Sequence, residues 1–114
     1  MAGSGRKKQR RSKKDERLAK LIRALDHRLR RRILRQLVDA GRPLSPVRVA
    51  ELLGESLSNV SYHTNLLREL EAIKLKSQRQ VRGAVEHFYL PATGDNKAIM
   101  TLLEETRKAD EAAG

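Results

Sequence analysis

The fold is decided by residues 50–70, which read AELLGESLSNVSYHTNLLREL. Two short amphipathic segments meet here at a junction of three residues, Gly54 to Ser56. Gly54 can end the first segment as a helix, because glycine adopts the left-handed backbone conformation without strain. Ser56 can cap the next helix by accepting a hydrogen bond from one of its free amides. The pattern predicts two helices joined by a tight turn, the second running from about residue 57 to 70.

The second of these helices has an unusual outer face. Its apolar side chains recur on one side at helical spacing, whereas the other side carries Ser58, Ser61, Tyr62 and Asn65. A solvated helix face is usually rich in Glu and Lys, but a face that reads base edges needs short hydrogen-bonding groups and no carboxylates. We therefore predict that these four residues, together with Asn59, contact DNA bases.

Two further helices are predicted before this pair, and the start of the pair's first helix can also be placed. The first begins near Asp15, the second is capped by Asp26 and ended by Gly41, and the third begins at Ser45 with Pro46 in its first turn. After residue 70 the period changes. Two extended segments, together spanning 74–90, surround an Arg-Gly turn and predict a β-hairpin, and a last helix is expected over about 95–109.

This order of elements predicts a mainly α fold with a β-hairpin wing (α+β), which is a winged helix-turn-helix with about five helices. We expect one domain over residues 15–114, preceded by a disordered basic tail over 1–14. The tail holds seven basic residues and no acid, and the whole chain has a formal net charge of +11. Such an excess predicts a polyanionic partner, with a purely solubilising charge as the alternative.

Two more segments complete a resemblance to a known family. The stretch LDHRLRRRIL at 25–34 and the stretch VRGAVEHFY at 81–89, taken with the turn and helix above, resemble ArsR-type winged helix-turn-helix transcriptional regulators over roughly residues 17–92. The hairpin looks like that of a metal-independent branch. The chain departs from the family pattern at three positions: Arg28 stands where Pro is frequent, Thr64 where Leu is common, and Glu71 where Gly is usual.

The resemblance implies a symmetric homodimer that binds double-stranded DNA, with each recognition helix in a major groove and each wing on the backbone or minor groove. Repression is the default role in that family. The predicted contacts to the DNA backbone are Ser56, Arg48, His63, Arg79 and Arg82.

The dimer interface is predicted from two apolar stripes, one on the first helix and one on the last. Packing of the last helix on its own domain is the alternative. The predicted interface residues are Leu18, Leu21, Ile22, Leu25, Ile99, Leu102, Leu103 and Thr106.

Other classes of function find little support in the sequence. The chain has no cysteine, and its three histidines lack the close spacing of a chelate, so we expect no metal and no cofactor. No catalytic grouping stands out, and no apolar run approaches the length of a membrane helix. We expect a cytoplasmic bacterial protein whose effector, if it has one, the sequence does not identify. The alternative function is a winged-helix module that binds RNA or a protein and has only non-specific affinity for nucleic acid.

Overall fold

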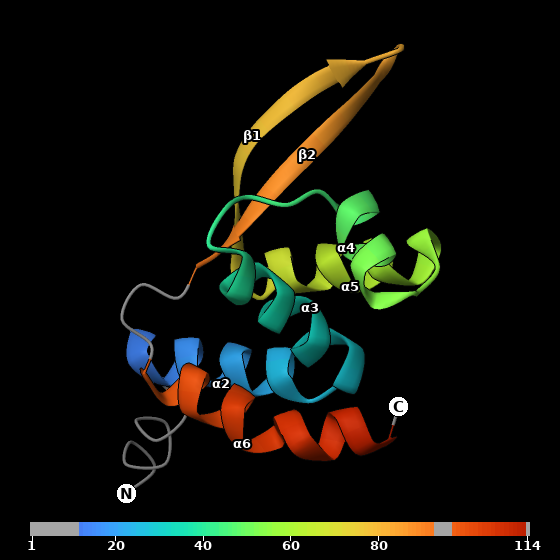
Figure 1. Cartoon of the computed structure of the whole chain (residues 1–114). Helices are drawn as coiled ribbons and strands as arrows, with labels where there is room; N and C mark the ends of the chain where they lie inside the picture. The colour runs from blue at the N-terminus through green and yellow to red at the C-terminus, as the bar shows by residue number, and fades with distance from the viewer. Residues whose placement is uncertain (1–11, 93–96, 114) are drawn as a thin grey trace, which may run out of the picture.

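The computed structural model describes residues 12–92 and 97–113, and it has five helices and one hairpin in these ranges. A two-stranded antiparallel sheet forms the wing at one end of the molecule, and the first and last helices lie at the other end (Figure 1). This arrangement confirms the predicted winged helix-turn-helix. The elements are α2 (Lys13–Leu25), α3 (Arg28–Ala40), α4 (Pro46–Leu53), α5 (Leu57–Glu69), β1 (Ile73–Val81), β2 (Ala84–Pro91) and α6 (Lys97–Ala113).

The helix starts follow the capping residues, with two corrections to the predictions. Ser12 caps α2, so this helix begins two residues before the predicted Asp15, while residues 1–11 of the predicted tail lie outside the described ranges. The cap of α3 is His27 and not Asp26: the Nδ1 atom of His27 accepts a hydrogen bond from the Leu29 amide at 3.1 Å. Asp26 instead ends α2, because its own amide donates to the Arg23 carbonyl.

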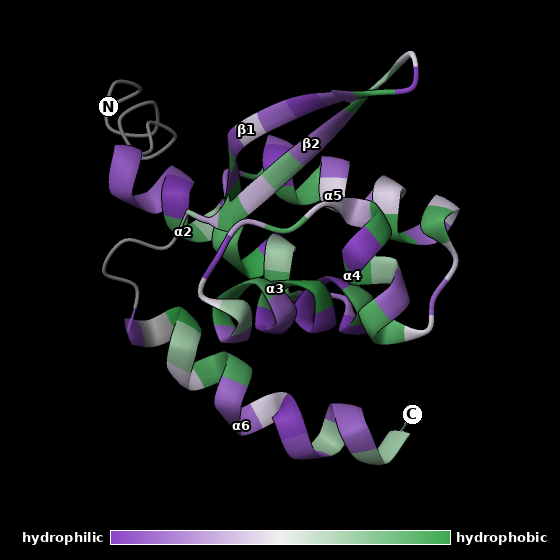
Figure 2. Ribbon diagram, turned by 45° about the horizontal axis from the view of Figure 1, so that its top comes forward, coloured by the Kyte–Doolittle hydropathy of each residue, from purple (hydrophilic) through white to green (hydrophobic). Residues whose placement is uncertain are grey.

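The core is built around α3. Its residues Ile33, Leu34 and Leu37 are almost fully buried, and they pack with Val60 and Leu67 of α5 in one apolar cluster. Burying a side chain of this size stabilises the fold by about 1.5–3 kcal/mol. In Figure 2, hydrophobic and hydrophilic residues alternate along α3 at the centre, whereas β1 is mostly hydrophilic. The hydrophobic faces of α3 and α5 are therefore buried against each other in the core, and the polar face of α5 remains at the surface.

The wing is a tight hairpin anchored at its base. Val81 pairs with Ala84, so Arg82 and Gly83 form a two-residue turn in which both have positive φ, +49° and +81°. Positive φ at both positions is typical of the hairpin turn whose twist matches that of the strands. At the base, Tyr89 exchanges two backbone hydrogen bonds with Leu44, at 2.9 and 3.1 Å, which ties β2 to the helical part.

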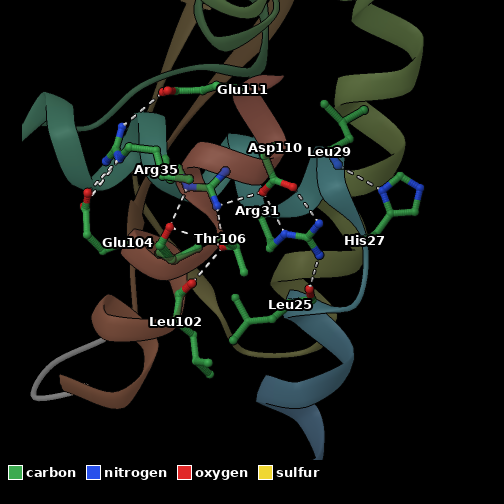
Figure 3. Close-up of polar contacts among 12 residues, drawn as sticks. Leu25, His27, Leu29, Arg31, Arg35, Leu102, Glu104, Thr106, Asp110 and Glu111 are labelled. Atoms are coloured by element: carbon green, nitrogen blue, oxygen red, sulfur yellow. Dashed lines mark hydrogen bonds and ion pairs between the residues drawn. The ribbon is translucent and has the colours of Figure 1, made fainter. Parts of the chain in front are cut away.

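An ion cluster fastens α6 to α3 (Figure 3). Asp110 accepts two hydrogen bonds of 2.8 Å from the Arg31 guanidinium and forms an ion pair of 2.8 Å with Arg35. Arg35 and Asp110 are both buried, and Arg35 also donates to the Leu103 carbonyl. The hydrogen bonds from Arg31, and then those from Arg35, hold the pKa of Asp110 well below its usual range. The cluster therefore stays ionised at neutral pH.

The part of the chain that the structure describes contains no helix long and apolar enough to cross a membrane. Within residues 12–92 and 97–113, no group of three or more His, Cys, Asp or Glu side chains is arranged to hold a metal ion.

Candidate nucleic-acid interface

The turn between α4 and α5 has the expected three residues. Gly54 adopts a φ of +67°, and the amide of Glu55 donates to the Ala50 carbonyl, which closes the end of α4. Ser56 is extended, and its hydroxyl oxygen accepts a hydrogen bond of 3.1 Å from the Asn59 amide. The hydroxyl predicted to contact the DNA backbone is thus also the cap that starts α5.

The exposed surface of α5 divides into three strips. Val60, Thr64 and Leu67 are buried, and helical geometry places the predicted contact residues around the opposite side. Among them Tyr62 has 61% of its surface exposed. We name the strips the crest (Ser58 and Tyr62), the wing strip (Ser61 and Asn65) and the α3 strip (Asn59 and His63).

The wing strip borders a concave region of about 460 Å³ between α4, α5 and the hairpin. Ser61 and Asn65 lie on its α5 side, and apolar side chains line much of the rest. The sequence pattern did not indicate these apolar residues as a group, because each of them reads as part of a separate amphipathic element. They are Pro46, Val47, Leu57, Val81, Ala84 and Val85.

The α3 strip borders a second pocket. The His63 ring lies 4.2 Å from the His27 ring, measured between centroids, and the Arg30 Nη1 atom is 3.4 Å from His63 Nδ1. Burial, followed by the charges of Arg30 and Arg31, lowers the pKa of His27. Burial, followed by His27 and Arg30, lowers the pKa of His63. Both rings are therefore neutral at pH 7, and His63 offers the predicted backbone contact as a neutral group.

The predicted backbone contacts from arginine differ in their freedom. Arg82 is exposed at the tip of the wing. Arg79 is held 3.1 Å from Glu86 and lies over the Phe88 ring, and Arg48 is 3.2 Å from Glu51. These carboxylates reduce the positive charge that Arg79 and Arg48 present to a phosphate. The wing also exposes Lys74 and Lys76, which were not among the predicted contacts, although both are basic residues on the predicted strand.

The residues predicted for the dimer interface fall into two groups. Leu18, Ile22 and Leu102 are exposed by 56%, 59% and 47%, and Met100, which was not predicted, is exposed by 42%. The remaining predicted residues are engaged within the chain. Thr106 hydrogen-bonds to Arg35, Leu21 and Leu25 pack at the edge of the core, and Ile99 and Leu103 are buried in it. The last helix thus packs on its own domain with one face and exposes apolar residues on another.

The fold, with the exposed helix α5 directly after the tight turn, defines a winged helix-turn-helix protein. Residues 25–75 match a family described as a helix-turn-helix domain. No curated protein sequence matches the chain.

Solved structures with the same fold span nearly the whole chain. HlyU from Vibrio cholerae is 21% identical, with 87% of this chain and 97% of HlyU covered, at a TM-score of 0.59. NolR from Sinorhizobium fredii is 22% identical, with 84% and 86% covered, at 0.57. The homodimeric winged helix-turn-helix DNA-binding domain Mb0332 from Mycobacterium bovis, described as a possible ArsR-family transcriptional regulator, is 17% identical, with 89% and 88% covered, at 0.57. These structures confirm the winged helix-turn-helix fold that the sequence predicts.

Proposed function

We propose that the chain is a transcriptional regulator that binds double-stranded DNA sequence-specifically as a homodimer. In this proposal α5 enters the major groove, and the wing lies along the backbone or minor groove. The observation that carries the proposal is the outer side of α5, where Ser58, Ser61 and Asn65 present short hydrogen-bonding groups beside the hydroxyl of Tyr62. The helix has no carboxylate before Glu69, so nothing along its first three turns repels the groove.

Exposed positive charge surrounds this polar surface. Arg82 lies at the tip of the wing, and Lys74 and Lys76 lie along β1. Phosphate contacts from such side chains supply affinity and register, whereas the base contacts supply specificity. We assign the basic residues of the N-terminal tail to non-specific phosphate contact.

The exposed apolar residues of α2 and α6 support the homodimer. Leu18 and Ile22 lie one turn apart on α2, and together with Leu102 of α6 they would be covered if this part of the surface met the same part of a second copy. A two-fold dimer places two recognition helices about one turn of DNA apart, and a protein seated over that length excludes others. We therefore propose repression as the outcome of binding.

A binding titration tests the proposed function. The protein is titrated onto random duplexes and onto duplexes selected by binding, at several salt concentrations, together with Ser61→Glu and Tyr62→Ala. The new carboxylate repels the groove, and we expect Ser61→Glu to weaken binding to the selected duplex roughly a hundredfold or more. Ala112→Glu, which adds the same charge at an exposed position near the end of α6 and away from the proposed dimer face, is the matched control and should change little.

The alternative function predicts a different result. If no sequence is selected, and binding is weak, steeply salt-dependent and indifferent to Ser61→Glu and Tyr62→Ala, then the basic residues alone hold the DNA. The winged helix would in that case serve RNA or a protein partner.

A further inference from the structure

A pocket of about 340 Å³ lies between the beginning of α3 and the α3 strip of α5. It is on the side of α5 away from the wing, because Asn59 and His63 line it, whereas Ser61 and Asn65 line the concave region under the wing. The residues that line the pocket are His27, Arg28, Leu29, Arg32, Glu55, Asn59 and His63.

Arg28 is the arginine of this pocket that has no partner among the described residues. The other four arginines of α3 are engaged: Arg31 and Arg35 with Asp110, Arg32 with Glu55, and Arg30 with two backbone carbonyls. Arg28 forms no ion pair and no side-chain hydrogen bond with any described residue, and its buried Nε atom lacks a partner there. A buried donor without an acceptor is costly, so an anion at this place would be stabilised.

The two histidines add neutral hydrogen-bond donors. The Nδ1 atom of His27 accepts from the Leu29 amide, and Nδ1 of His63 faces the Arg30 guanidinium, which can only donate. Each neutral ring must therefore carry its proton on Nε2. Figure 3 shows the hydrogen bond between the Leu29 amide and Nδ1 of His27, with the second ring nitrogen on the side away from Leu29.

The charges around the pocket leave one cation uncompensated. Glu55 is its carboxylate, and Arg32 neutralises it at 3.4 Å. Arg28 remains as the positive charge without a counter-charge. The side-chain amide of Asn59 and the two imidazoles are uncharged hydrogen-bond donors beside it. The charged and titratable groups that face the histidine pair are Asp26 at the end of α2, Arg28, Arg30, Arg31 and Arg32 of α3, Glu55 of the turn, and Tyr62 of α5.

We propose that this pocket binds a backbone phosphate of the DNA, on the strand that borders the major groove opposite the wing. A helix in the major groove has a phosphate backbone on each side of it. In this arrangement the wing contacts the phosphate backbone on one side of α5, and the pocket contacts the phosphate backbone on the other side. The inference rests on the proposed function and adds a contact in which Arg28 supplies the charge and His27, Asn59 and His63 supply neutral hydrogen bonds.

The salt dependence of binding separates the charged contact from the neutral ones. Arg28→Gln should weaken binding roughly tenfold on selected and random duplexes alike, and it should reduce the slope of log K against log salt by about 0.9. Lys108→Gln removes an equal charge from an exposed position on α6 and should leave affinity and slope unchanged. His63→Leu should weaken binding without changing the slope, because a neutral donor releases no counterion. If His63→Leu fails to fold, Asn59→Ala replaces it, and we again expect weaker binding with an unchanged salt slope.

The outcomes also separate the pocket from the proposed function. If the wild-type protein selects no duplex, the proposed function fails, and the salt slope of Arg28→Gln on random duplexes still decides whether the pocket contacts a phosphate. If it selects one, and Arg28→Gln retains both affinity and slope, the phosphate contact is wrong. A third arm adds inorganic phosphate alone. If phosphate raises the thermal midpoint of the wild type but not of Arg28→Gln, while the DNA slope is the same for both, the pocket takes a small phosphorylated ligand instead.

Discussion

The two sides of α3 differ in how completely their buried polar groups are hydrogen-bonded. On the side of α6, Asp110 receives both Arg31 and Arg35, and Thr106 completes the cluster. On the side of α5, the structure leaves two buried polar atoms without a partner among the described residues, Nε of Arg28 and Oγ1 of Thr64. One side of the helix is therefore a satisfied structural joint, whereas the side nearer the recognition helix retains hydrogen-bonding capacity.

This contrast changes how the positive charge of the sequence is interpreted. Residues 15–35 hold eight basic side chains, which in the sequence alone favour a polyanionic partner. Five of them bind groups within the chain: Lys20 pairs with Glu71, and Arg30, Arg31, Arg32 and Arg35 pair as described above. Charge density in this segment thus reports the packing of α3 as much as it reports affinity for DNA.

Removing Asp110 should have the largest effect, because it breaks the satisfied side. Asp110→Asn leaves Arg31 and the buried Arg35 without their counter-charge, and we expect the free energy of unfolding to fall by about 3–5 kcal/mol. Urea denaturation measures the change. Glu111→Gln, at an exposed carboxylate on the same helix, is the control. If the two variants unfolded at the same midpoint, the cluster would not be what fastens α6.

A pair of threonine variants sharpens the contrast between the two sides. Thr64→Val replaces a buried hydroxyl that has no partner among the described residues with a methyl group of similar size, and should stabilise the protein by about 1 kcal/mol. Thr106→Val removes a hydroxyl that bonds to Arg35 and to the Leu102 carbonyl, and should destabilise it by about 1 kcal/mol. Thermal unfolding of the two variants gives the signs. Equal signs would show that the two sides are alike after all.

A pH series tests the histidine pair with smaller changes. The pKa values of His27 and His63 are lowered in the folded state, so the folded protein favours the neutral rings. The stability that the two neutral rings contribute is therefore complete above the unfolded pKa of about 6.5, and it declines as the pH falls below that value. Asp110 contributes nothing to the change between pH 7 and pH 5, because its pKa lies far lower. His27→Asn keeps a capping group and removes one ring, so it should lose less stability over this range in urea melts. An equal loss in both proteins would contradict the assignment.

The sequence alone predicts the order and type of the elements and the outward face of α5. Capping serines, Pro46 and the two-residue turn of the wing are local signals, and local hydrogen bonds decide where these elements begin and end. The polar side of α5 was equally readable, because helical spacing puts Val60, Thr64 and Leu67 together on the buried side and leaves the contact candidates outside. The departures from the family pattern at Thr64 and Glu71 also have structural counterparts, since the Thr64 hydroxyl is buried without a described partner and Glu71 has a φ of +63°.

Contacts between distant segments could not be read in the same way. Nothing in the local pattern indicates that Asp110 lies among the arginines of α3, which are far away along the chain. Nor does periodicity tell which apolar residues of α6 face inward, because Ile99 and Leu102 belong to the same amphipathic stripe and only packing on α3 separates them. The cap of α3 was misplaced by one residue because both Asp26 and His27 can accept an amide hydrogen bond.

Glu71 and Arg82 are the described residues other than glycine that have positive φ, at +63° and +49°. Glycine would relieve the backbone at both, and the genetic code reaches glycine from any glutamate or arginine codon through one nucleotide substitution. Laboratory evolution for heat resistance should therefore return Glu71→Gly and Arg82→Gly early. At position 82 the same substitution removes the cation at the tip of the wing. Selection for thermal resistance would therefore favour glycine at this position, whereas selection for DNA binding would favour arginine.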